Sequence, residues 1–201
     1  MELFKRVITT VLAALVLTSC SSMNSAITIG DKEFSTSDVQ KPVDEVLRDR
    51  KKVDTSQMQL AEADELLRNQ AQFYIVGILL DRIAADKKLS VTNADIAARR
   101  TEILSQVGGE AELPKALVGA SLAQSNLDAY LKILIISEKL SKDIILSGVS
   151  SEQAAEEVNK IVVALAKKLG VKVNPKYGKW NPDTASIESG DLTDGAVIPA
   201  P

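Results

Sequence analysis

The chain has 201 residues, with 24 lysines and arginines against 27 aspartates and glutamates, and a formal net charge of −3. It has one cysteine and no histidine, which excludes enzymes with a catalytic histidine, metal sites ligated by histidine, and any disulfide within the chain. A slightly acidic chain without a basic stripe lacks the charge with which proteins neutralise nucleic-acid phosphates, so we expect no nucleic-acid partner.

The first 20 residues have the pattern of a secretory signal that ends at the only cysteine. Lys5 and Arg6 give it a positively charged start, and residues 7–17 form an apolar run. This run is shorter than the about 20 residues of a membrane-spanning helix. It closes on Leu17-Thr18-Ser19-Cys20, which resembles the bacterial lipobox. In lipoproteins with this motif, the cysteine thiol carries a diacylglyceryl group and the cysteine becomes the new N-terminus.

We therefore predict a lipoprotein signal peptide at 1–19, lipidation of Cys20, and a short lipidated tether at 20–25. The alternative is an ordinary signal peptide with a cysteine near its cleavage site. The predicted location is the extracytoplasmic face of the cell membrane, with a lipid anchor. A tether of five or six residues reaches only about 20 Å, so the folded domain is expected to sit close to the bilayer.

Beyond the tether, the sequence predicts one mainly α domain over residues 26–180, with about six helices and a short strand at each end. Residues 26–30 combine β-branched side chains with a Gly-Asp turn, which is typical of a strand. A helix capped by Ser35–Asp38 is expected next. One long helix should follow over residues 56–88, and its segment Phe73–Leu80 is apolar on nearly all sides.

Four further helices are predicted from caps, apolar spacing and glycine stops. In chain order they run from Val91–Asp95 to Gly108–Gly109, over Leu113–Val118, from Ser125-Asn126 to Gly148, and from Ser150-Ser151 to Gly170.

The end of the domain is predicted to close back onto its beginning. A second strand is expected at 171–174, and it should pair with residues 26–30 because strands this short are not stable alone. Tyr177 and Trp180 are expected to pack against these strands, with an interface anchor as the alternative. The C-terminal tail, residues 181–201, is rich in Ser, Thr, Asp, Gly and Pro and is predicted to be disordered. Its removal should then cost almost no stability.

This order of elements resembles the N-terminal domain of the SurA and PrsA foldases, and it is similar in type to the C-terminal chaperone region of trigger factor. The likeness is carried by Ile27-Thr28-Ile29-Gly30-Asp31 followed by Ser35-Thr36-Ser37-Asp38-Val39. The closing segment Gly170–Trp180 is similar to that of actinobacterial lipoproteins of this family, and the likeness covers roughly residues 26–182. The resemblance implies a closed helical chaperone domain of the SurA type.

The chain also departs from that family. The foldases carry parvulin prolyl-isomerase domains between the helical region and the closing helix, whereas here Leu146–Ser151 joins the two parts directly. Parvulin active sites also use histidines, and the chain has none. The resemblance therefore implies binding without isomerase activity.

No catalytic, cofactor-binding or metal-ligating residues are predicted. The acidic clusters are interpreted as solvated surface, and Gly108-Gly109 is interpreted as a helix stop and not as a phosphate-binding loop. These clusters are Glu62-Asp64-Glu65, Glu152-Glu156-Glu157, and Asp183, Glu188, Asp191 and Asp194 in the tail. The chain is not expected to be an enzyme.

Two functional hypotheses follow from the sequence. The first is a chaperone-like holdase that binds unfolded or partly folded exported proteins in an apolar groove between helices. Phe73–Leu80 and Ile133–Ile136 are the candidate lining segments, although core packing is the expected role of most of these residues. The second is an adaptor or structural lipoprotein that docks one envelope partner through its acidic tail, with Tyr177 and Trp180 as anchors. No individual client-binding residue is assigned.

Overall fold

The computed structural model describes residues 24–190. The predicted signal peptide at 1–19, the lipidation site Cys20, most of the tether and the end of the chain at 191–201 lie outside this range. Within it, the prediction of a mainly helical domain with a small antiparallel sheet formed by its two ends is confirmed. The helices of the described part are α1 (Thr36–Asp49), α2 (Ala63–Asp86), α3 (Asn93–Val107), α4 (Leu113–Gly119), α5 (Leu127–Leu146) and α6 (Ser151–Leu169).

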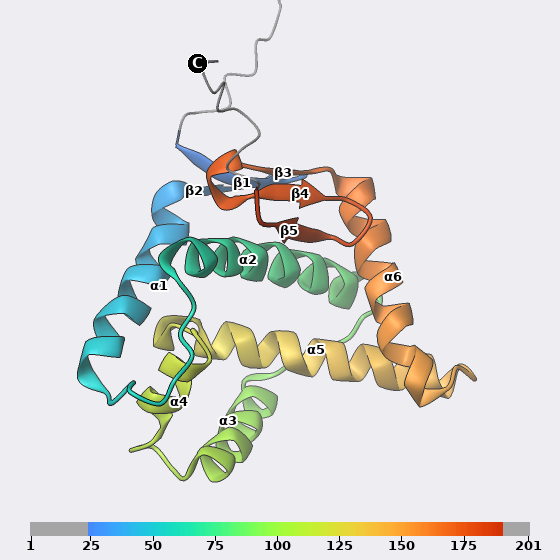
Figure 1. Cartoon of the computed structure of the whole chain (residues 1–201). Helices are drawn as coiled ribbons and strands as arrows, with labels where there is room; N and C mark the ends of the chain where they lie inside the picture. The colour runs from blue at the N-terminus through green and yellow to red at the C-terminus, as the bar shows by residue number, and fades with distance from the viewer. Residues whose placement is uncertain (1–23, 191–201) are drawn as a thin grey trace, which may run out of the picture.

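The elements form layers around α2. The sheet lies above α2 in Figure 1, α5 runs below it, and α3 and α4 lie below α5. Helices α1 and α6 flank the stack on opposite sides. The central position of α2 explains its composition, because Ala71, Ile75 and Leu79 are fully buried against elements on several sides. These three residues are spaced four apart, so they form one stripe of α2 that faces the core.

The domain is closed by a sheet of three strands in the order β2-β1-β3. The strands are β1 (Ser25–Ile29), β2 (Lys32–Ser35) and β3 (Val171–Val173). The predicted pairing of the two domain ends is confirmed, since Ile27 pairs with Val173 and Ile29 with Val171 in an antiparallel register. The prediction of a single strand at the first end was incomplete, because β1 also pairs with β2 across the Gly30-Asp31 turn.

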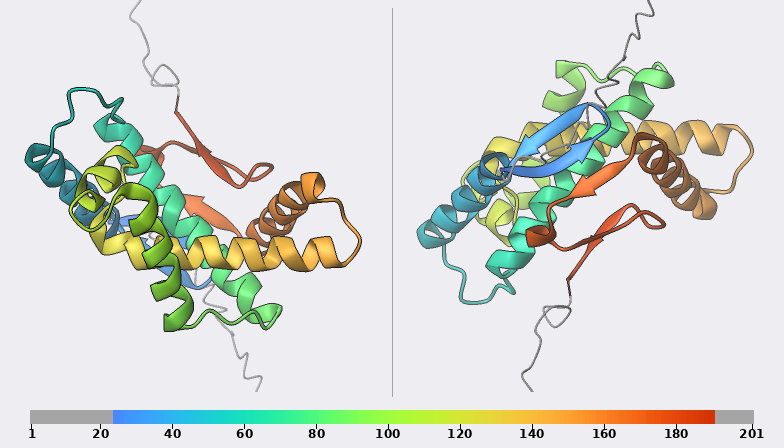
Figure 2. Two further views of the ribbon diagram at one scale, coloured as in Figure 1. Left: turned by 90° about the horizontal axis from the view of Figure 1, so that it is seen from below. Right: turned by 90° about the horizontal axis from the view of Figure 1, so that it is seen from above.

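The prediction of a disordered tail from residue 181 is wrong for residues 181–190. Strand β4 (Lys179–Asn181) pairs with β5 (Ser186–Glu188), and the hairpin lies beside β3 (Figure 2). Ala185 and Ile187 are buried in the main core. The Gln72 side chain of α2 donates to the Ala185 carbonyl at 2.9 Å and accepts from the Ile187 amide at 2.8 Å. Ordered structure therefore continues ten residues beyond the predicted end of the domain.

The long second helix begins later than predicted, at Ala63 and not at residue 56. Residues 53–62 form a loop in which the Asp54 carboxylate accepts from the Ser56 amide at 3.0 Å. The Met58 amide then donates to the Thr55 carbonyl at 3.0 Å. These two hydrogen bonds, one to an aspartate side chain and one within a turn, satisfy backbone amides without a helix. The Arg50 guanidinium holds the end of the loop by donating to the Ala61 carbonyl at 2.9 Å.

The other predicted helix ends are confirmed to within about two residues. Ser35 and Thr92 cap α1 and α3 with reciprocal capping boxes to Asp38 and Asp95. Gly108 ends α3 with a positive φ of 96°, as its interpretation as a helix stop requires. Local sequence therefore determines most boundaries, and the loop at 53–62 is the main exception.

Candidate functional site

An apolar groove lies between α2 and α5, beside strand β2. It has a volume of about 260 Å³, which is slightly below the roughly 300–1,000 Å³ of typical small-molecule sites. This volume is enough for one or two large side chains of another molecule. Its lining residues are Phe34 from β2; Phe73, Tyr74, Gly77, Ile78 and Asp81 from α2; and Asn126, Ala129, Lys132 and Ile133 at the start of and along α5.

The two apolar segments singled out in the sequence divide between core and groove. Ile75 and Leu79 of the first segment, and Ile135 and Ile136 of the second, are buried in the core. The prediction that core packing takes most of these residues holds only in part, because fewer than half of them are buried. Four other positions of the first segment, together with Ile133 of the second, are only partly buried and line the groove; the four are Phe73, Tyr74, Gly77 and Ile78.

Aromatic side chains form one wall of the groove. The Phe34 and Tyr74 rings stack with centroids 4.7 Å apart, and the Phe73 and Tyr74 centroids are 6.0 Å apart in a tilted arrangement. These are the distances at which aromatic pairs attract one another. Phe34 was not predicted, because nothing in the sequence connects it with a helix that begins almost thirty residues later. Only the tertiary fold places it there.

The polar end of Tyr74 points away from bulk water. Its hydroxyl donates to the Asp38 carbonyl of α1 at 3.1 Å. Burial raises the pKa of the Tyr74 phenol, and the Asp38 carboxylate raises this pKa further. The phenol therefore stays protonated at neutral pH and serves as a fixed hydrogen-bond donor. It orients the ring in the groove wall and has no feature of a proton-transfer group.

Charged groups lie at one end of the groove. The Lys132 ammonium and the Asp81 carboxylate form an ion pair at 2.7 Å, and both side chains are more than 40% exposed. An exposed pair of this kind contributes little stability, typically about 0–1 kcal/mol. It does give the apolar groove a polar rim that carries both signs of charge.

A smaller pocket of about 180 Å³ adjoins the groove at Phe73, which lines both. Its other lining residues are Asn69 and Gln70 of α2, Ala120, Ser121 and Leu122, and Tyr130 of α5. The Asn126 side-chain amide donates to the Gln70 side-chain oxygen at 2.9 Å in a buried bond. The two hollows therefore form one strip along α2, with an amide pair fixed beneath it.

The remaining predicted sites are placed as follows. Tyr177 is buried and Trp180 packs against the main core, so the packing interpretation of both residues is confirmed. The acidic residues of the described clusters lie on the surface, with Glu157 partly covered. Within residues 24–190 there is no cluster of three or more acidic side chains arranged to hold a metal ion. No helix of the same range is long and apolar enough to cross a membrane.

Comparison of the chain with protein-family models, with curated proteins and with solved structures gives no match. The resemblance to the SurA-type foldases therefore stays a prediction. What can be said of function depends on the groove and on the sequence signals at the N-terminus.

Proposed function

We propose that the protein is a chaperone-like holdase, tethered to the extracytoplasmic face of the membrane, that binds apolar segments of unfolded or partly folded exported proteins. The observation that supports this proposal is the half-exposed aromatic and aliphatic groove between α2 and α5. Apolar grooves with polar rims are a common way of binding segments of other chains. The proposed activity is binding alone, without prolyl isomerisation.

The position of the groove fits a membrane-tethered protein. Ser25, at the start of β1, pairs with Ser35 of β2. Phe34, the residue before Ser35, lines the groove. Three residues lie between Cys20 and Asn24, so the four steps from one to the other span about 14 Å when fully extended. A lipid on Cys20 would thus hold the groove close to the membrane surface, where exported chains emerge.

The alternative, an adaptor lipoprotein that docks one envelope partner, has lost part of its support. Its proposed anchors Tyr177 and Trp180 pack into the domain, and the first ten residues of its proposed docking tail belong to the fold. The two functions differ in breadth of binding. Suppression of aggregation of several unrelated unfolded proteins favours the holdase, whereas a single tight partner recovered from the envelope favours the adaptor.

Filling the groove should weaken client binding without unfolding the domain. Gly77 faces Ile133, and a Cβ atom placed on Gly77 would lie at an ordinary contact distance of 3.5 Å from Ile133 Cδ1. Because Gly77 lines the groove, the rest of the side chain in Gly77→Leu should extend into it and occupy the space of a client side chain. Since burial of one such side chain is worth about 1.5–3 kcal/mol, we expect at least about tenfold weaker suppression of aggregation, measured by light scattering with residues 20–201.

Ala155→Leu is the matched control for Gly77→Leu. Ala155 is exposed on α6 and does not line the groove, so the same apolar bulk is added elsewhere. This variant should retain full activity, and urea unfolding should show that both variants are folded. Equal suppression by the two variants would show that the groove is not the client site. No suppression by the unmodified protein would reject the holdase itself.

Replacement of Cys20 should abolish membrane attachment. Cys20→Ala removes the thiol to which the predicted diacylglyceryl group is attached. The two acyl chains of that group are what would make the anchor stable. We expect loss of lipid label and a soluble or unprocessed precursor, measured by metabolic labelling and membrane fractionation. Retention of the label and of the membrane fraction would contradict the lipoprotein prediction.

A further inference from the structure

Helix α3 is attached to the domain differently from the other helices. Every other α-helix of the described part contains buried residues, whereas α3 contains none. The surrounding stretch 85–112 likewise has no buried residue. Segments with so little burial are those that open locally at low free energy.

The surface beneath α3 is strongly apolar. Leu131 is fully buried there, and it belongs to a separate cluster from the main core. Four aliphatic side chains of α3 pack on this cluster while remaining partly exposed. The four are Ile96, Ile103, Leu104 and Val107, and the buried residues that they cover are Leu113 and Leu117 of α4 and Leu127 and Leu131 of α5.

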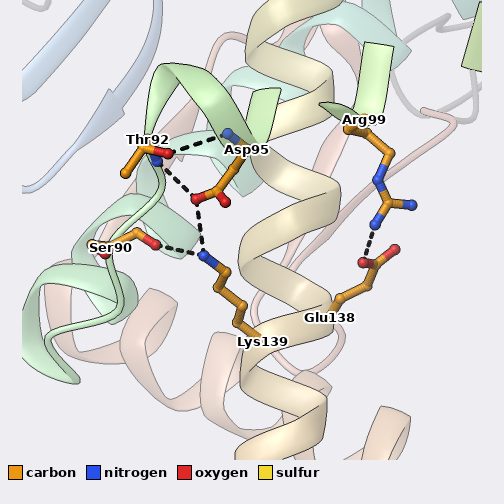
Figure 3. Close-up of polar contacts among 6 residues, drawn as sticks. All are labelled: Ser90, Thr92, Asp95, Arg99, Glu138 and Lys139. Carbon is orange, nitrogen blue, oxygen red and sulfur yellow. Dashed lines mark hydrogen bonds and ion pairs between the residues drawn. The ribbon is translucent and has the colours of Figure 1, made fainter. Parts of the chain in front are cut away.

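Polar contacts with α5 hold α3 in place (Figure 3). The Lys139 ammonium pairs with the Asp95 carboxylate at 3.1 Å and donates to the Ser90 carbonyl at 2.8 Å. Arg99 pairs with Glu138 one residue earlier on α5. The Thr92 amide and the Lys139 ammonium both lower the pKa of Asp95, so this carboxylate is charged at neutral pH. Lys139 and Asp95 are each 38% exposed, which keeps the contact weak and sensitive to salt.

Two glycines follow α3, and aliphatic anchors precede it. Gly108 and Gly109 follow it with φ values of 96° and 102°, and a side chain on Gly109 would meet no atom within 4 Å. At the other end, Leu89 and Val91 pack on the cluster formed by α2, α5 and α6. The chain is thus anchored up to Val91 and again from Leu113, and α3 lies between these two points.

We propose that α3 is a flap that opens as a unit while the rest of the domain stays folded, and that Lys139 and Glu138 of α5 form its clasp. Opening uncovers the aliphatic surface of α4 and α5, and so controls how much apolar surface the protein presents. Opening of α3 is a property of the domain and does not require the proposed holdase function. A role of this opening in client binding does rest on that proposed function.

Hydrogen exchange followed by mass spectrometry tests the flap without any client. With residues 20–201 at neutral pH and low salt, amides of α3 should exchange at least about 100-fold faster than those of α2. Lys139→Met removes the clasp lysine and should speed exchange in α3 by a further fivefold or so, with α2 unchanged. About 0.5 M NaCl should reduce the difference between the variant and the unmodified protein.

Lys160→Met is the control, because the ion pairs of Lys160 among residues 24–190 lie within α6, with Glu156 and Glu157. It should leave exchange in α3 unchanged. Equal exchange rates in α3 and α2 would overturn the flap. A Lys139→Met variant that leaves α3 unchanged, or speeds α2 as much as α3, would overturn the clasp. Protection of α2 in the same experiment reports whether each variant is folded.

Discussion

Truncation after Asn181 should lower the thermal midpoint by about 10 °C, whereas truncation after Gly190 should leave it unchanged. The shorter chain loses β5, the buried side chains of Ala185 and Ile187, and both partners of the Gln72 amide. Loss of a buried isoleucine and of two hydrogen bonds between the Gln72 side chain and the backbone amounts to about 3–5 kcal/mol. At this chain length, each kcal/mol shifts the midpoint by about 2–4 °C.

A third truncation, after Gly170, should leave no cooperative transition at all. It also removes β3, the partner of the fully buried residues Ile27 and Ile29 in β1. Calorimetry or circular dichroism on the three truncations provides the measurement, and the chain ending at Gly190 is the control because it keeps every described contact. If the chains ending at Asn181 and Gly190 melt together, the hairpin contributes nothing to stability and its docking on α2 is refuted.

Gly178→Ala should be among the most damaging single substitutions in the chain. A Cβ atom on Gly178 would lie 2.2 Å from the Glu188 carbonyl oxygen and 2.9 Å from Ile187 Cγ2. One of these contacts is with backbone, so β5 would have to separate from the turn that precedes β4. Gly178 also has a φ of 121°, a region that is almost restricted to glycine. We expect a loss of about 3 kcal/mol or more in the free energy of unfolding, measured in urea.

Gly148→Ala separates the cost of the steric clash from the cost of the positive φ. Gly148 has a similarly positive φ of 101°, but a Cβ atom there would meet nothing within 4 Å. This variant should lose only the conformational part, about 1–2 kcal/mol. A Gly178→Ala variant no less stable than Gly148→Ala would show that the hairpin is not held against Gly178 as described.

The elements with local signals could be predicted from sequence. Thr92 with Asp95, and Gly108 after an apolar period, specify the two ends of α3 through bonds within a few residues. The β4–β5 hairpin has only a turn signal, in which the Asn181 side-chain oxygen accepts from the Asp183 amide at 2.9 Å. Its strands are three residues long, and their anchor on Gln72 lies more than one hundred residues earlier in the chain. The polar composition alone predicts disorder. The hydrogen bonds of the distant Gln72 amide and the burial of Ala185 and Ile187 hold the hairpin in place nevertheless.

The candidate groove could be predicted only in part, because only part of it is specified by local sequence. Its two helical walls stand out as apolar segments, so the sequence points to α2 and α5. The division of each segment between core and groove depends on what covers each side. Ile75 and Leu79 pack with residues of β1 and α1, whereas Ile136 packs with residues of α6. Phe34 enters the wall by stacking on Tyr74, forty residues away. Pairings of this kind are tertiary and leave no trace in local spacing.

The central position of β1 has a consequence for how the chain acquires its structure. One edge of β1 is satisfied at once by β2, but its other edge pairs with Val171–Val173, near the opposite end of the domain. A chain that emerges N-terminus first, from a ribosome or across a membrane, leaves this edge open until almost the whole domain has appeared. Contacts so distant in sequence also slow folding. The three-stranded sheet therefore cannot be completed until residues 171–173 are available.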